Sequence, residues 1–439
     1  MPASASPESR VPSPGFTATD HAILARALRL AERGLFTTQP NPRVGCVIAQ
    51  SEEIVGEGWH QRAGEPHAEV FALRAAGERA RGATAYVTLE PCSHHGRTPP
   101  CADALIEAGI ARVVFASEDP NPKVAGAGIR RLREAGVAVE AGLMRDAARD
   151  LNRGFFSRFE RGRPWVRVKL AMSLDGRTAL ANGESKWITG ESARADVQRW
   201  RARSSAILTG AGTARADDPR LTVRLGSLSP GGFIVGGEGW GEGVKLPGAK
   251  GPGNPGQSRD VRNALLGDVQ PGTGGHPLTQ PSPPSDADGG EGFKPLRVVL
   301  DARLDALQPG AHLLDGSTPT LVVHAPGARP RDNRYGRAEL ADVPMGANGH
   351  IDLAAALRSL ADRQVNELQV EAGPALCGSL FEQNLVDELL LYVAPVLLGD
   401  SARPLLALPP LPDMAARHHL RVVEQRRVGN DLRLLLRPA

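Results

Sequence analysis

Three potential metal ligands, His67, Cys92 and Cys101, restrict the fold of this chain more than any other feature of its sequence. His67 lies at the start of one predicted helix, Cys92 follows a predicted strand, and Cys101 opens the next predicted helix. Ligands that share one ion must converge on it. The first third of the chain must therefore bring two helix starts and one strand end together.

One imidazole and two thiolates suit zinc, and three protein ligands leave a fourth position open for water. The metal lowers the pKa of that water towards neutrality. Glu69, two residues after His67, is placed to take a proton from the water and deliver it to a departing amine. A structural zinc site would normally need a fourth ligand and would give Glu69 no task. A chance placement of a core histidine and buried cysteines would require three motif elements to coincide. We therefore favour a catalytic site.

The four cysteines of the chain do not point to a disulfide framework. Cys46, Cys92, Cys101 and Cys377 are spaced unlike the cysteines of a cross-linked domain, so metal chemistry is the better interpretation. Cys46 lies in an apolar run and is predicted to be a small core residue rather than a ligand.

The chain has 439 residues, which favours at least two domains. In residues 20–160, strands and helices alternate, and this pattern predicts a sheet with helices on its faces. Asp20 is the predicted N-cap of the first helix. The predicted helices are 20–34, 67–76, 101–108, 129–135 and 143–160, and the predicted strands are 44–49, 54–59, 84–89, 111–116 and 137–140.

A second α/β domain is predicted over residues 161–439, with the boundary near residue 160. Residues 226–294 interrupt it: they contain 19 Gly and 9 Pro among 69 residues and are predicted to be a disordered surface insertion. Residues 1–19 are predicted to be a disordered tail. The predicted strands are 165–171, 206–209, 296–301, 321–324, 368–371 and 389–393, and the predicted helices are 192–202, 353–363 and 375–385.

Composition excludes some classes of function. The net charge is 52 − 49 = +3 and is spread along the chain, which is too weak to argue for nucleic acid. Apolar runs stay below the roughly 18 residues of a membrane span. The N-terminal tail resembles neither a secretory signal nor a transit peptide, so we expect a soluble, cytoplasmic protein.

The order His-x-Glu and then Pro-Cys resembles the cytidine-deaminase superfamily, although Cys92 and Cys101 are separated by eight residues instead of two. That long interval, together with residues 40–45 (PNPRVG), 64–69 (GEPHAE) and 119–122 (DPNP), resembles the bacterial bifunctional riboflavin-biosynthesis deaminase/reductase family. Its two activities are diaminohydroxyphosphoribosylaminopyrimidine deaminase and 5-amino-6-(5-phosphoribosylamino)uracil reductase.

The resemblance implies a cytidine-deaminase-like three-layer domain at residues 20–160. This domain would deaminate 2,5-diamino-6-ribosylamino-4(3H)-pyrimidinone 5′-phosphate, with zinc on His67, Cys92 and Cys101 and with Glu69 as the catalytic residue. Asn41 would contact the pyrimidine edge. His94 and Arg97 fit a phosphate or ribose contact, although exposed loop polarity is an alternative for both.

The second half matches the reductase of the same family through residues 169–177 (KLAMSLDGR), 185–189 (SKWIT), 216–219 (ADDP) and 370–374 (VEAGP). The resemblance implies a dihydrofolate-reductase-like α/β domain that uses NADPH to reduce the ribosyl group to ribityl, giving 5-amino-6-ribitylaminouracil 5′-phosphate. Gly373 and Pro374 turn into a predicted helix, where free backbone N–H groups suit a pyrophosphate. This turn is not the Gly-x-Gly-x-x-Gly fingerprint.

Site residues of the reductase follow from the same resemblance. Arg201 and Arg224 suit the substrate phosphate, because a guanidinium can bond two oxygens at once. Trp187 could instead be a core aromatic, and Asp175 could fix the turn at Gly176. The predicted NADPH residues are Ala171, Trp187, Thr213, Asp217, Gly373, Pro374, Ala375, Leu376, Cys377, Gly378 and Ser379, and the predicted substrate residues are Ser185, Arg201, Leu221, Arg224 and Glu371.

Two other functions would use a similar zinc site. A nucleic-acid-editing deaminase would need a basic groove with interleaved aromatic residues, yet aromatics are only 4% of the chain, and the second domain would be unexplained. A zinc-stabilised binding module would leave Glu69 without a role. We therefore expect a small phosphorylated pyrimidine as the partner, with no nucleic acid and no membrane, and the resemblance implies a homo-oligomer.

Overall fold

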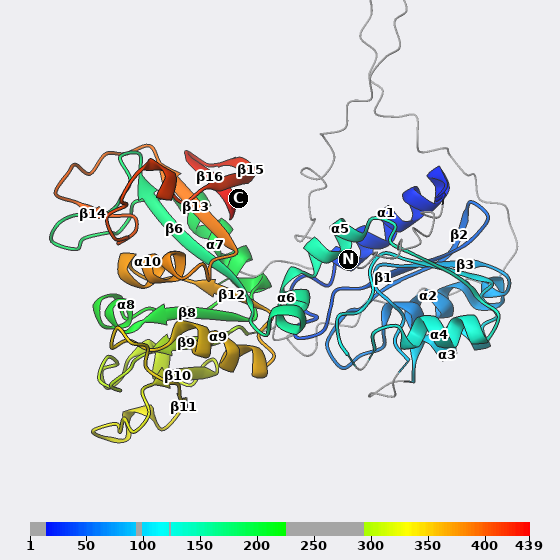
Figure 1. Cartoon of the computed structure of the whole chain (residues 1–439), viewed down its shortest axis with the longest axis horizontal. Coiled ribbons are helices and arrows are strands. Elements are labelled where there is room, and N and C mark those ends of the chain that lie inside the picture. Colours follow the sequence, from blue (N-terminus) through cyan, green and yellow to red (C-terminus); the bar gives the residue numbers. More distant parts are fainter. Residues whose placement is uncertain (1–14, 94–98, 123, 225–293) are drawn as a thin grey trace, which may run out of the picture. The chain divides into compact units, whose positions relative to one another are not determined.

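Two β-sheets organise the chain in the computed structural model, which describes residues 15–93, 99–122, 124–224 and 294–439 (Figure 1). A five-stranded sheet has the order β2-β1-β3-β4-β5, and a nine-stranded sheet has the order β11-β10-β9-β8-β12-β6-β13-β16-β15. The described residues belong to one compact unit by their contacts. The first sheet ends at Ala141 and the second begins at Trp165, so the domain boundary predicted near residue 160 falls between the two sheets.

The first sheet combines an antiparallel hairpin with parallel strands. β1 pairs with β2 and β3 in antiparallel fashion, whereas β3, β4 and β5 are parallel. The strands are β1 (Gly45–Gln50), β2 (Glu53–Trp59), β3 (Thr84–Val87), β4 (Arg112–Phe115) and β5 (Ala138–Ala141), and the helices are α1 (Ala18–Glu32), α2 (Ala68–Ala76), α3 (Cys101–Glu107), α4 (Ala127–Glu134), and the 3-10 turn η1 (Gly77–Ala80).

Alternating side chains of this sheet enter two different cores, because successive strand residues point to opposite faces. Cys46 and Ile48 pack with α2, α3 and α4, whereas Val47 and Ala49 pack with α1 on the other face. The result is a helix–sheet–helix arrangement, which confirms the three-layer expectation for this half. Cys46 is a fully buried free thiol in the core, as predicted.

Glycines in β2 set the position of α2. A Cβ added to Gly58 would lie 2.3 Å from the carbonyl oxygen of Ala68, and one added to Gly56 would lie 2.2 Å from that of Ala72. Since real Cβ atoms never approach backbone so closely, only glycine lets the helix lie this near the strand. This close packing holds the first turn of α2, which carries Glu69, against the sheet.

The first helix begins earlier than predicted. Thr17 is its N-cap, and Thr17 and Asp20 form a capping box in which the Asp20 N–H donates to the Thr17 hydroxyl at 3.0 Å. Asp20 is therefore the third helical residue rather than the cap, and Phe16 packs against the core. The prediction of a disordered tail over residues 1–19 is wrong for its last residues, because Phe16 packs against the core and Thr17 caps α1. Residues 1–14 lie outside the described residues.

The expected helix over residues 143–160 is two helices, α5 (Arg145–Leu151) and α6 (Arg153–Arg161). They meet at Asn152, whose side chain bonds both backbone groups of Arg43. The Arg43 N–H donates to Asn152 Oδ1 at 2.8 Å, and Asn152 Nδ2 donates to the Arg43 carbonyl at 2.9 Å. This buried tertiary contact interrupts a locally continuous helical pattern.

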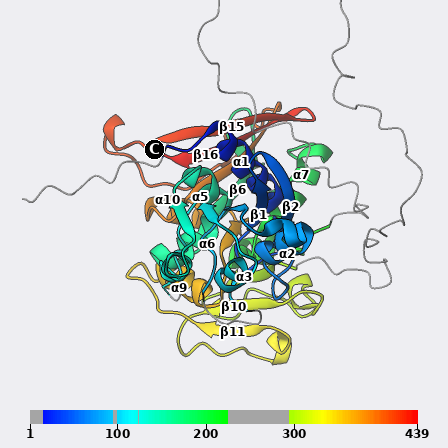
Figure 2. The same cartoon turned by 90° about the vertical axis from the view of Figure 1, so that its right-hand side faces the viewer.

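In the nine-stranded sheet, the strands from β11 to β13 are parallel, and β13, β16 and β15 are antiparallel, with β11 and β15 at the two edges (Figure 2). The strands are β6 (Trp165–Ser173), β8 (Ala206–Gly210), β9 (Leu296–Leu300), β10 (Thr320–His324), β11 (Glu339–Asp342), β12 (Glu367–Val370), β13 (Glu388–Ala394), β15 (Leu420–Val428) and β16 (Asp431–Pro438). The short strands β7 (Arg177–Ala179) and β14 (Arg403–Pro404) pair separately.

The helices of this half are α7 (Glu191–Arg203), α8 (Ala211–Asp217), α9 (Leu353–Asp362) and α10 (Pro374–Glu382), with the 3-10 turns η2 (His312–Leu314), η3 (Asn333–Tyr335) and η4 (Met414–Ala416). The carboxyl ends of β8, β9 and β12 meet at one edge of the sheet, because parallel strands end on the same side. This arrangement confirms the second α/β sheet that the sequence predicted.

Two other expectations concern the predicted insertion and the absence of membrane-spanning helices. The predicted insertion, residues 226–294, lies outside the described residues except for Lys294. Among the helices that the structure describes, none combines the length and the apolarity that crossing a membrane requires.

Candidate active sites

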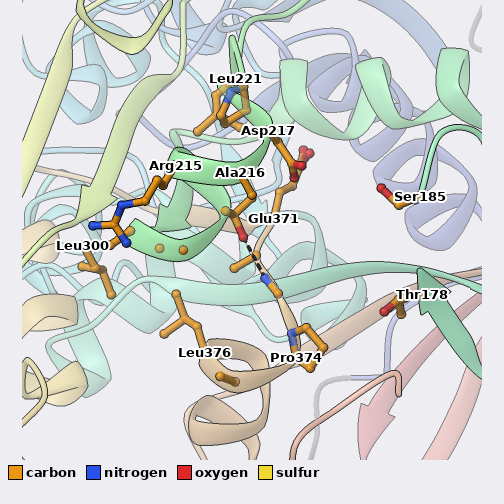
Figure 3. Close-up of a pocket in the computed structure, with 18 of the residues that line it drawn as sticks. Thr178, Ser185, Arg215, Ala216, Asp217, Leu221, Leu300, Glu371, Pro374 and Leu376 are labelled. Atoms are coloured by element: carbon orange, nitrogen blue, oxygen red, sulfur yellow. Dashed lines mark hydrogen bonds between the residues drawn. The ribbon is translucent and has the colours of Figure 1, made fainter. Parts of the chain in front are cut away.

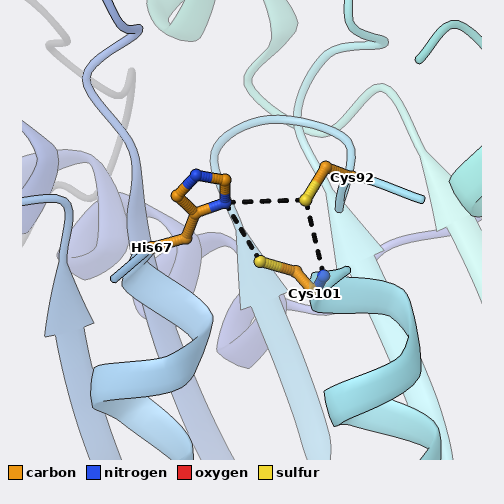
Figure 4. Close-up of side chains that lie close together, drawn as sticks. All are labelled: His67, Cys92 and Cys101. Atoms are coloured by element: carbon orange, nitrogen blue, oxygen red, sulfur yellow. Dashed lines mark hydrogen bonds between the residues drawn. The ribbon is translucent and has the colours of Figure 1, made fainter. Parts of the chain in front are cut away.

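The three predicted metal ligands come together (Figure 4). His67 Nδ1 lies 3.2 Å from the Sγ of Cys101 and 3.5 Å from the Sγ of Cys92, and all three ligand atoms lie within 4.8 Å of one another. His67 is the N-cap of α2, Cys101 is the first residue of α3, and Cys92 follows β3. This largely buried set of one imidazole and two thiols fits a zinc ion.

The three side chains differ in charge state: the pKa of Cys92 is lowered, whereas the pKa values of His67 and Cys101 are raised. The hydrogen bond with the Cys101 thiol and the interaction with His67 lower the pKa of Cys92 well below its usual range, despite its burial. The Cys101 N–H also donates to Cys92 Sγ at 3.4 Å. The hydrogen bond with Cys92 in turn raises the pKa of His67 to about 8. A metal that binds here displaces protons from these side chains, so its affinity rises with pH.

Glu69 lies in the first turn of α2, and only 3% of it is exposed. Burial raises the pKa of Glu69, and the neighbouring Cys92 adds to this effect while His67 opposes it. Its Oε2 has no hydrogen-bond partner among the described residues. A buried carboxyl group with a raised pKa and a free oxygen can accept and return a proton.

Asn41 is connected to the metal ligands through His60, a residue that the sequence reasoning missed. Asn41 Nδ2 lies 3.1 Å from His60 Nε2, and the His60 and His67 rings meet edge to face with centroids 5.4 Å apart. The one sequence feature that could have pointed to His60 is its position directly after the strand β2. His94 and Arg97, which were also predicted to contact the substrate, lie outside the described residues.

A cleft of about 1610 Å³ opens at the carboxyl ends of the parallel strands in the second half (Figure 3). The segments after β8 and β12 line it, because these strands end beside one another. The predicted residues that line the cleft are Ala171, Trp187, Thr213, Asp217, Gly373, Pro374, Ala375, Leu376, Ser379, Ser185, Arg201, Leu221, Arg224 and Glu371.

Two predicted NADPH residues, Cys377 and Gly378, do not line the cleft. The Cys377 thiol is fully buried and donates to the Ala372 carbonyl at 3.4 Å. A Cβ on Gly378 would lie 2.1 Å from the Ala407 carbonyl oxygen. Both residues face the protein interior, since α10 presents only some of its residues to the cleft.

The start of α10, after the turn at Gly373 and Pro374, is open to an anionic group. The Gly373 N–H donates to the hydroxyl of Thr213 at 3.1 Å, which ties the turn to α8. A Cβ on Gly373 would meet nothing nearer than Thr213 Oγ1, at 3.7 Å, and one on Gly212 would meet nothing within 4 Å. Backbone can therefore be approached closely at both glycines, and the start of α10 adds the positive end of its dipole.

Inside the cleft, Arg201 forms an ion pair with Glu371 and also donates from Nη1 to the Thr222 carbonyl at 2.9 Å. Burial alone raises the pKa of Glu371, but Arg201 outweighs it, and the pKa falls to about 2. Lys169 of β6 lines the same cleft, where burial lowers its pKa and Glu371 partly restores it. The sequence reasoning gave Lys169 no role, although it opens a quoted motif.

The two alternatives left open for Trp187 and Asp175 are now distinguishable. Trp187 is 69% exposed at the cleft, with the Arg194 guanidinium 4.6 Å from its ring centroid, so it is not a core aromatic. Asp175 accepts backbone N–H groups from Leu398 at 3.1 Å and from Gly399 at 2.7 Å. Asp175 is not among the residues that line the cleft, and its bonds connect the loop after β6 with the loop at Leu398 and Gly399.

Comparisons with known protein families agree with this division of the chain. The model of the cytidine and deoxycytidylate deaminase zinc-binding region matches residues 17–117. The model of the RibD C-terminal domain matches residues 164–434, which is more than half of the chain.

Full-length relatives cover both halves. The chain is 46% identical to the riboflavin biosynthesis protein RibD of Escherichia coli over 95% of this chain and 99% of that protein, and 43% identical to that of Haemophilus influenzae over 96% and 98%. Among solved structures, Acinetobacter baumannii RibD has a TM-score of 0.75 at 38% identity, covering 96% of this chain and 99% of that one. A diaminohydroxyphosphoribosylaminopyrimidine deaminase/5-amino-6-(5-phosphoribosylamino)uracil reductase from Thermotoga maritima has a TM-score of 0.72 at 27% identity, with 96% and 99% coverage.

Proposed function

Because the chain belongs to the RibD family of riboflavin-biosynthesis proteins, we propose that its two sites act in succession on one small phosphorylated pyrimidine. The chain is a bifunctional enzyme with a deaminase half and a reductase half, and its cofactors are zinc and NADPH. The assignment of individual residues to these two activities is the proposal.

For the deaminase, we propose that His67, Cys92 and Cys101 hold zinc and that Glu69 transfers the protons. Zinc, when bound, activates a water molecule as a nucleophile. The substrate is 2,5-diamino-6-ribosylamino-4(3H)-pyrimidinone 5′-phosphate. Glu69 accepts a proton from the attacking water and delivers it to the amino group that leaves as ammonia. Asn41 and His60 lie beside the ligands and orient the pyrimidine edge.

The raised pKa of Glu69 suits both parts of this cycle. A carboxyl group whose pKa is raised by burial holds a proton more readily between its removal from water and its transfer to nitrogen. The free Oε2 supports the assignment, because a purely structural carboxylate in this position would be expected to have its oxygens satisfied. This free, buried oxygen beside the ligands is the observation that carries the deaminase assignment.

For the reductase, we propose that the start of α10, just after Gly373 and Pro374, binds the cofactor pyrophosphate and that Glu371 and Lys169 face the ribosyl group. NADPH, when bound, supplies the hydride that converts the ribosyl group into ribityl. Lys169 holds a proton beside Glu371 and can provide it to the ring oxygen as the sugar opens. The product is 5-amino-6-ribitylaminouracil 5′-phosphate.

Arg201 is less available to the substrate phosphate than the sequence suggested. Its Nε and Nη2 already bond Glu371, and Nη1 bonds a backbone carbonyl. We therefore propose that Arg201 acts chiefly by positioning Glu371, and that Arg224 and Ser185, which also line the cleft, contact the phosphate.

One assay tests the proposed function. Purified protein is incubated with zinc, the pyrimidinone phosphate and NADPH, while ammonia release and NADPH oxidation are followed separately. We expect ammonia without NADPH, and NADPH oxidation only after ammonia release has begun. Binding to tRNA at moderate salt without activity on the pyrimidine phosphate would instead support an editing deaminase.

The cellular location, the nucleic-acid binding and the oligomeric state of the enzyme are also part of the proposal. We propose that it acts in the cytoplasm, without nucleic acid, and as a homo-oligomer. Cell fractionation tests the first statement, a tRNA-binding measurement the second and light scattering of the purified protein the third.

A further inference from the structure

A short segment of the deaminase half, residues 39–43, is held by the reductase half on both sides of Asn41. The sequence assigned a role to Asn41 and left its neighbours Gln39 and Arg43 without one. Gln39 is 5% exposed and Arg43 is 4% exposed, and neither lines the reductase cleft. Burying a polar or charged side chain is costly unless its groups are bonded. The partners of these two residues therefore show what fixes the segment.

Asn366 is the main partner on the Gln39 side. Its Nδ2 donates to the Pro40 carbonyl at 2.7 Å and to Gln39 Oε1 at 3.1 Å. The Ser205 hydroxyl donates to the same Gln39 oxygen at 2.8 Å, and the Asn366 N–H donates to that hydroxyl at 3.0 Å. Because two acceptors face Nδ2, the orientation of the amide is fixed. Asn366 directly precedes β12 and Ser205 directly precedes β8, so the starts of two neighbouring strands hold this side.

Arg43 fixes the other side of the segment. Its Nη1 donates to Glu367 Oε1 at 2.8 Å, and Arg167 Nη2 donates to the other oxygen of this fully buried carboxylate at 3.0 Å. Glu367 follows Asn366 directly, so two consecutive residues of the reductase half bond the two ends of the segment. Gly154 of α6 lies close to the same point, because a Cβ added to it would lie 2.6 Å from the Asn366 carbonyl oxygen. This close packing leaves Asn366 little room to move.

Asn41 lies between these two anchored ends. Its N–H donates to the Thr38 carbonyl at 2.7 Å, and its Nδ2 lies 3.1 Å from Nε2 of His60, the residue that meets a metal ligand. Pro40 and Pro42 flank Asn41, and each proline ring fixes its own backbone φ angle. Few torsions are therefore free between the two ends, and a displacement of Pro40 moves Asn41 with it.

We propose that Asn366 of the reductase half is a positioning residue of the deaminase site: it holds Pro40 and Gln39, and through them it places Asn41 against the pyrimidine edge. This inference rests on the proposed deaminase function and on the contact proposed there for Asn41. Asn366 acts through Asn41 and does not itself contact the substrate. A side chain that binds a ligand must be held to within about 0.5 Å by its surroundings, and part of that support comes here from the other half of the enzyme.

A purely structural contact between the two halves is the competing interpretation. Its removal would lower the stability of the protein but would affect substrate binding no more than the removal of any other buried contact of equal strength. Asn366 does not line the reductase cleft, so a positioning role would act on one of the two reactions only. A change confined to the deaminase reaction, and within it to substrate binding, separates the two interpretations.

The experiment separates kcat from KM. Ammonia release is measured at increasing concentrations of the pyrimidinone phosphate with the zinc-loaded full-length protein and with its N366A variant. We expect the KM of N366A to rise about tenfold and kcat to change by less than about threefold, because a displaced Asn41 weakens the binding of ground state and transition state alike. The zinc content should not change. NADPH oxidation with the deaminated substrate should stay within about twofold of the wild type, because the cleft is untouched.

The matched control is T320V. Thr320 is another buried polar residue of the reductase half, and its hydroxyl bonds Arg297 Nε at 2.9 Å and the Leu313 carbonyl at 2.7 Å. T320V should lower the melting temperature at least as much as N366A, because one of the lost hydrogen bonds is charge-assisted. It should leave the KM for the pyrimidinone phosphate unchanged, since Thr320 does not contact residues 39–43.

Two further variants test whether Asn366 acts through Asn41. N41A alone should raise KM, and the double variant N366A/N41A should raise it no further, because the side chain that Asn366 positions is already missing. Q39M removes the bonds of Gln39 to Asn366 and Ser205 but keeps the bond between Asn366 and Pro40, so its KM should lie between those of the wild type and N366A. Q39M also decides the question if N366A does not fold.

Three results would overturn this inference. They are a KM of N366A equal to that of the wild type, a KM of Q39M equal to that of the wild type, and independent, multiplying effects of N366A and N41A in the double variant. A wild type that releases no ammonia from the pyrimidinone phosphate would instead refute the deaminase function itself, and an unchanged KM in N41A would refute the contact proposed for Asn41. These failures are therefore distinguishable.

Discussion

Arg201 donates from Nε and Nη2 to the two carboxylate oxygens of Glu371, with both distances 2.7 Å. The residues come from α7 and from the end of β12, and a third donor, Gln369 Nε2, reaches Glu371 Oε1 at 2.8 Å. This paired geometry keeps Glu371 ionised in a largely buried place. The carboxylate is thereby fixed in the cleft before any ligand arrives.

Replacing Arg201 with methionine should destabilise the protein by about 3–5 kcal/mol, because Glu371 would keep its burial and lose its counter-charge. Urea unfolding of R201M, E371Q and the double variant measures this effect. The double variant should be less destabilised than the sum of the two single changes. Additive losses would show that the two side chains do not interact in solution.

The same pair predicts how stability depends on pH. The folded-state pKa of Glu371 is about 2, below the ordinary value of 4.5. The stabilisation by its ionised carboxylate is therefore present above pH 4.5 and is lost as the pH falls towards 2. The difference in unfolding free energy between the wild type and R201M should therefore shrink over this interval. A difference that stays constant from neutral pH to pH 2 would contradict the lowered pKa.

Replacing Glu69 with glutamine should reduce ammonia release by about 100-fold or more while zinc stays bound, since the amide cannot transfer the proton. Metal content by atomic absorption and ammonia release are measured on the same sample. Reduction of the already deaminated substrate by NADPH serves as the control and should not change. Loss of zinc together with activity would indicate that Glu69 supports the metal site instead.

Removing zinc with a chelator should abolish ammonia release and should leave NADPH oxidation with the deaminated substrate intact. The reason is that His67, Cys92 and Cys101 lie in the first sheet's half, whereas the cleft is built by the second sheet. Adding zinc back should restore deamination. Parallel loss of both activities would show that the metal stabilises the whole protein.

Replacing Lys169 with methionine should lower the turnover of the reductase by about 100-fold and should change the affinity for NADPH little, if Lys169 provides a proton to the sugar. Stopped-flow oxidation of NADPH with the deaminated substrate measures the first quantity, and calorimetry measures the second. Unchanged turnover would assign Lys169 a purely electrostatic role beside Glu371.

The sequence predicted most helices and strands to within a few residues, because their apolar residues recur with the right period. The predictions are wrong where a contact with a residue far away in the sequence changes the local structure. The helical pattern of residues 143–160 continues through Asn152. No neighbouring residue indicates that the Asn152 side chain bonds the backbone of Arg43 and separates two helices there. Likewise, Cys377 and Gly378 were grouped with the cleft residues because a motif does not state which face of α10 is exposed.

The sequence by itself determined the chemistry that this protein can perform: an imidazole, two thiols and a carboxyl group at a spacing that suits zinc, and a glycine turn that suits a phosphate. Only the tertiary structure decided the charge states and the partners. Arg201 and Glu371 are 170 residues apart, and Asp301 faces inward because Tyr335 and Ala306 hold it there. Burial and neighbouring charge set the pKa of a side chain, and both arise from contacts between distant segments that no local pattern encodes.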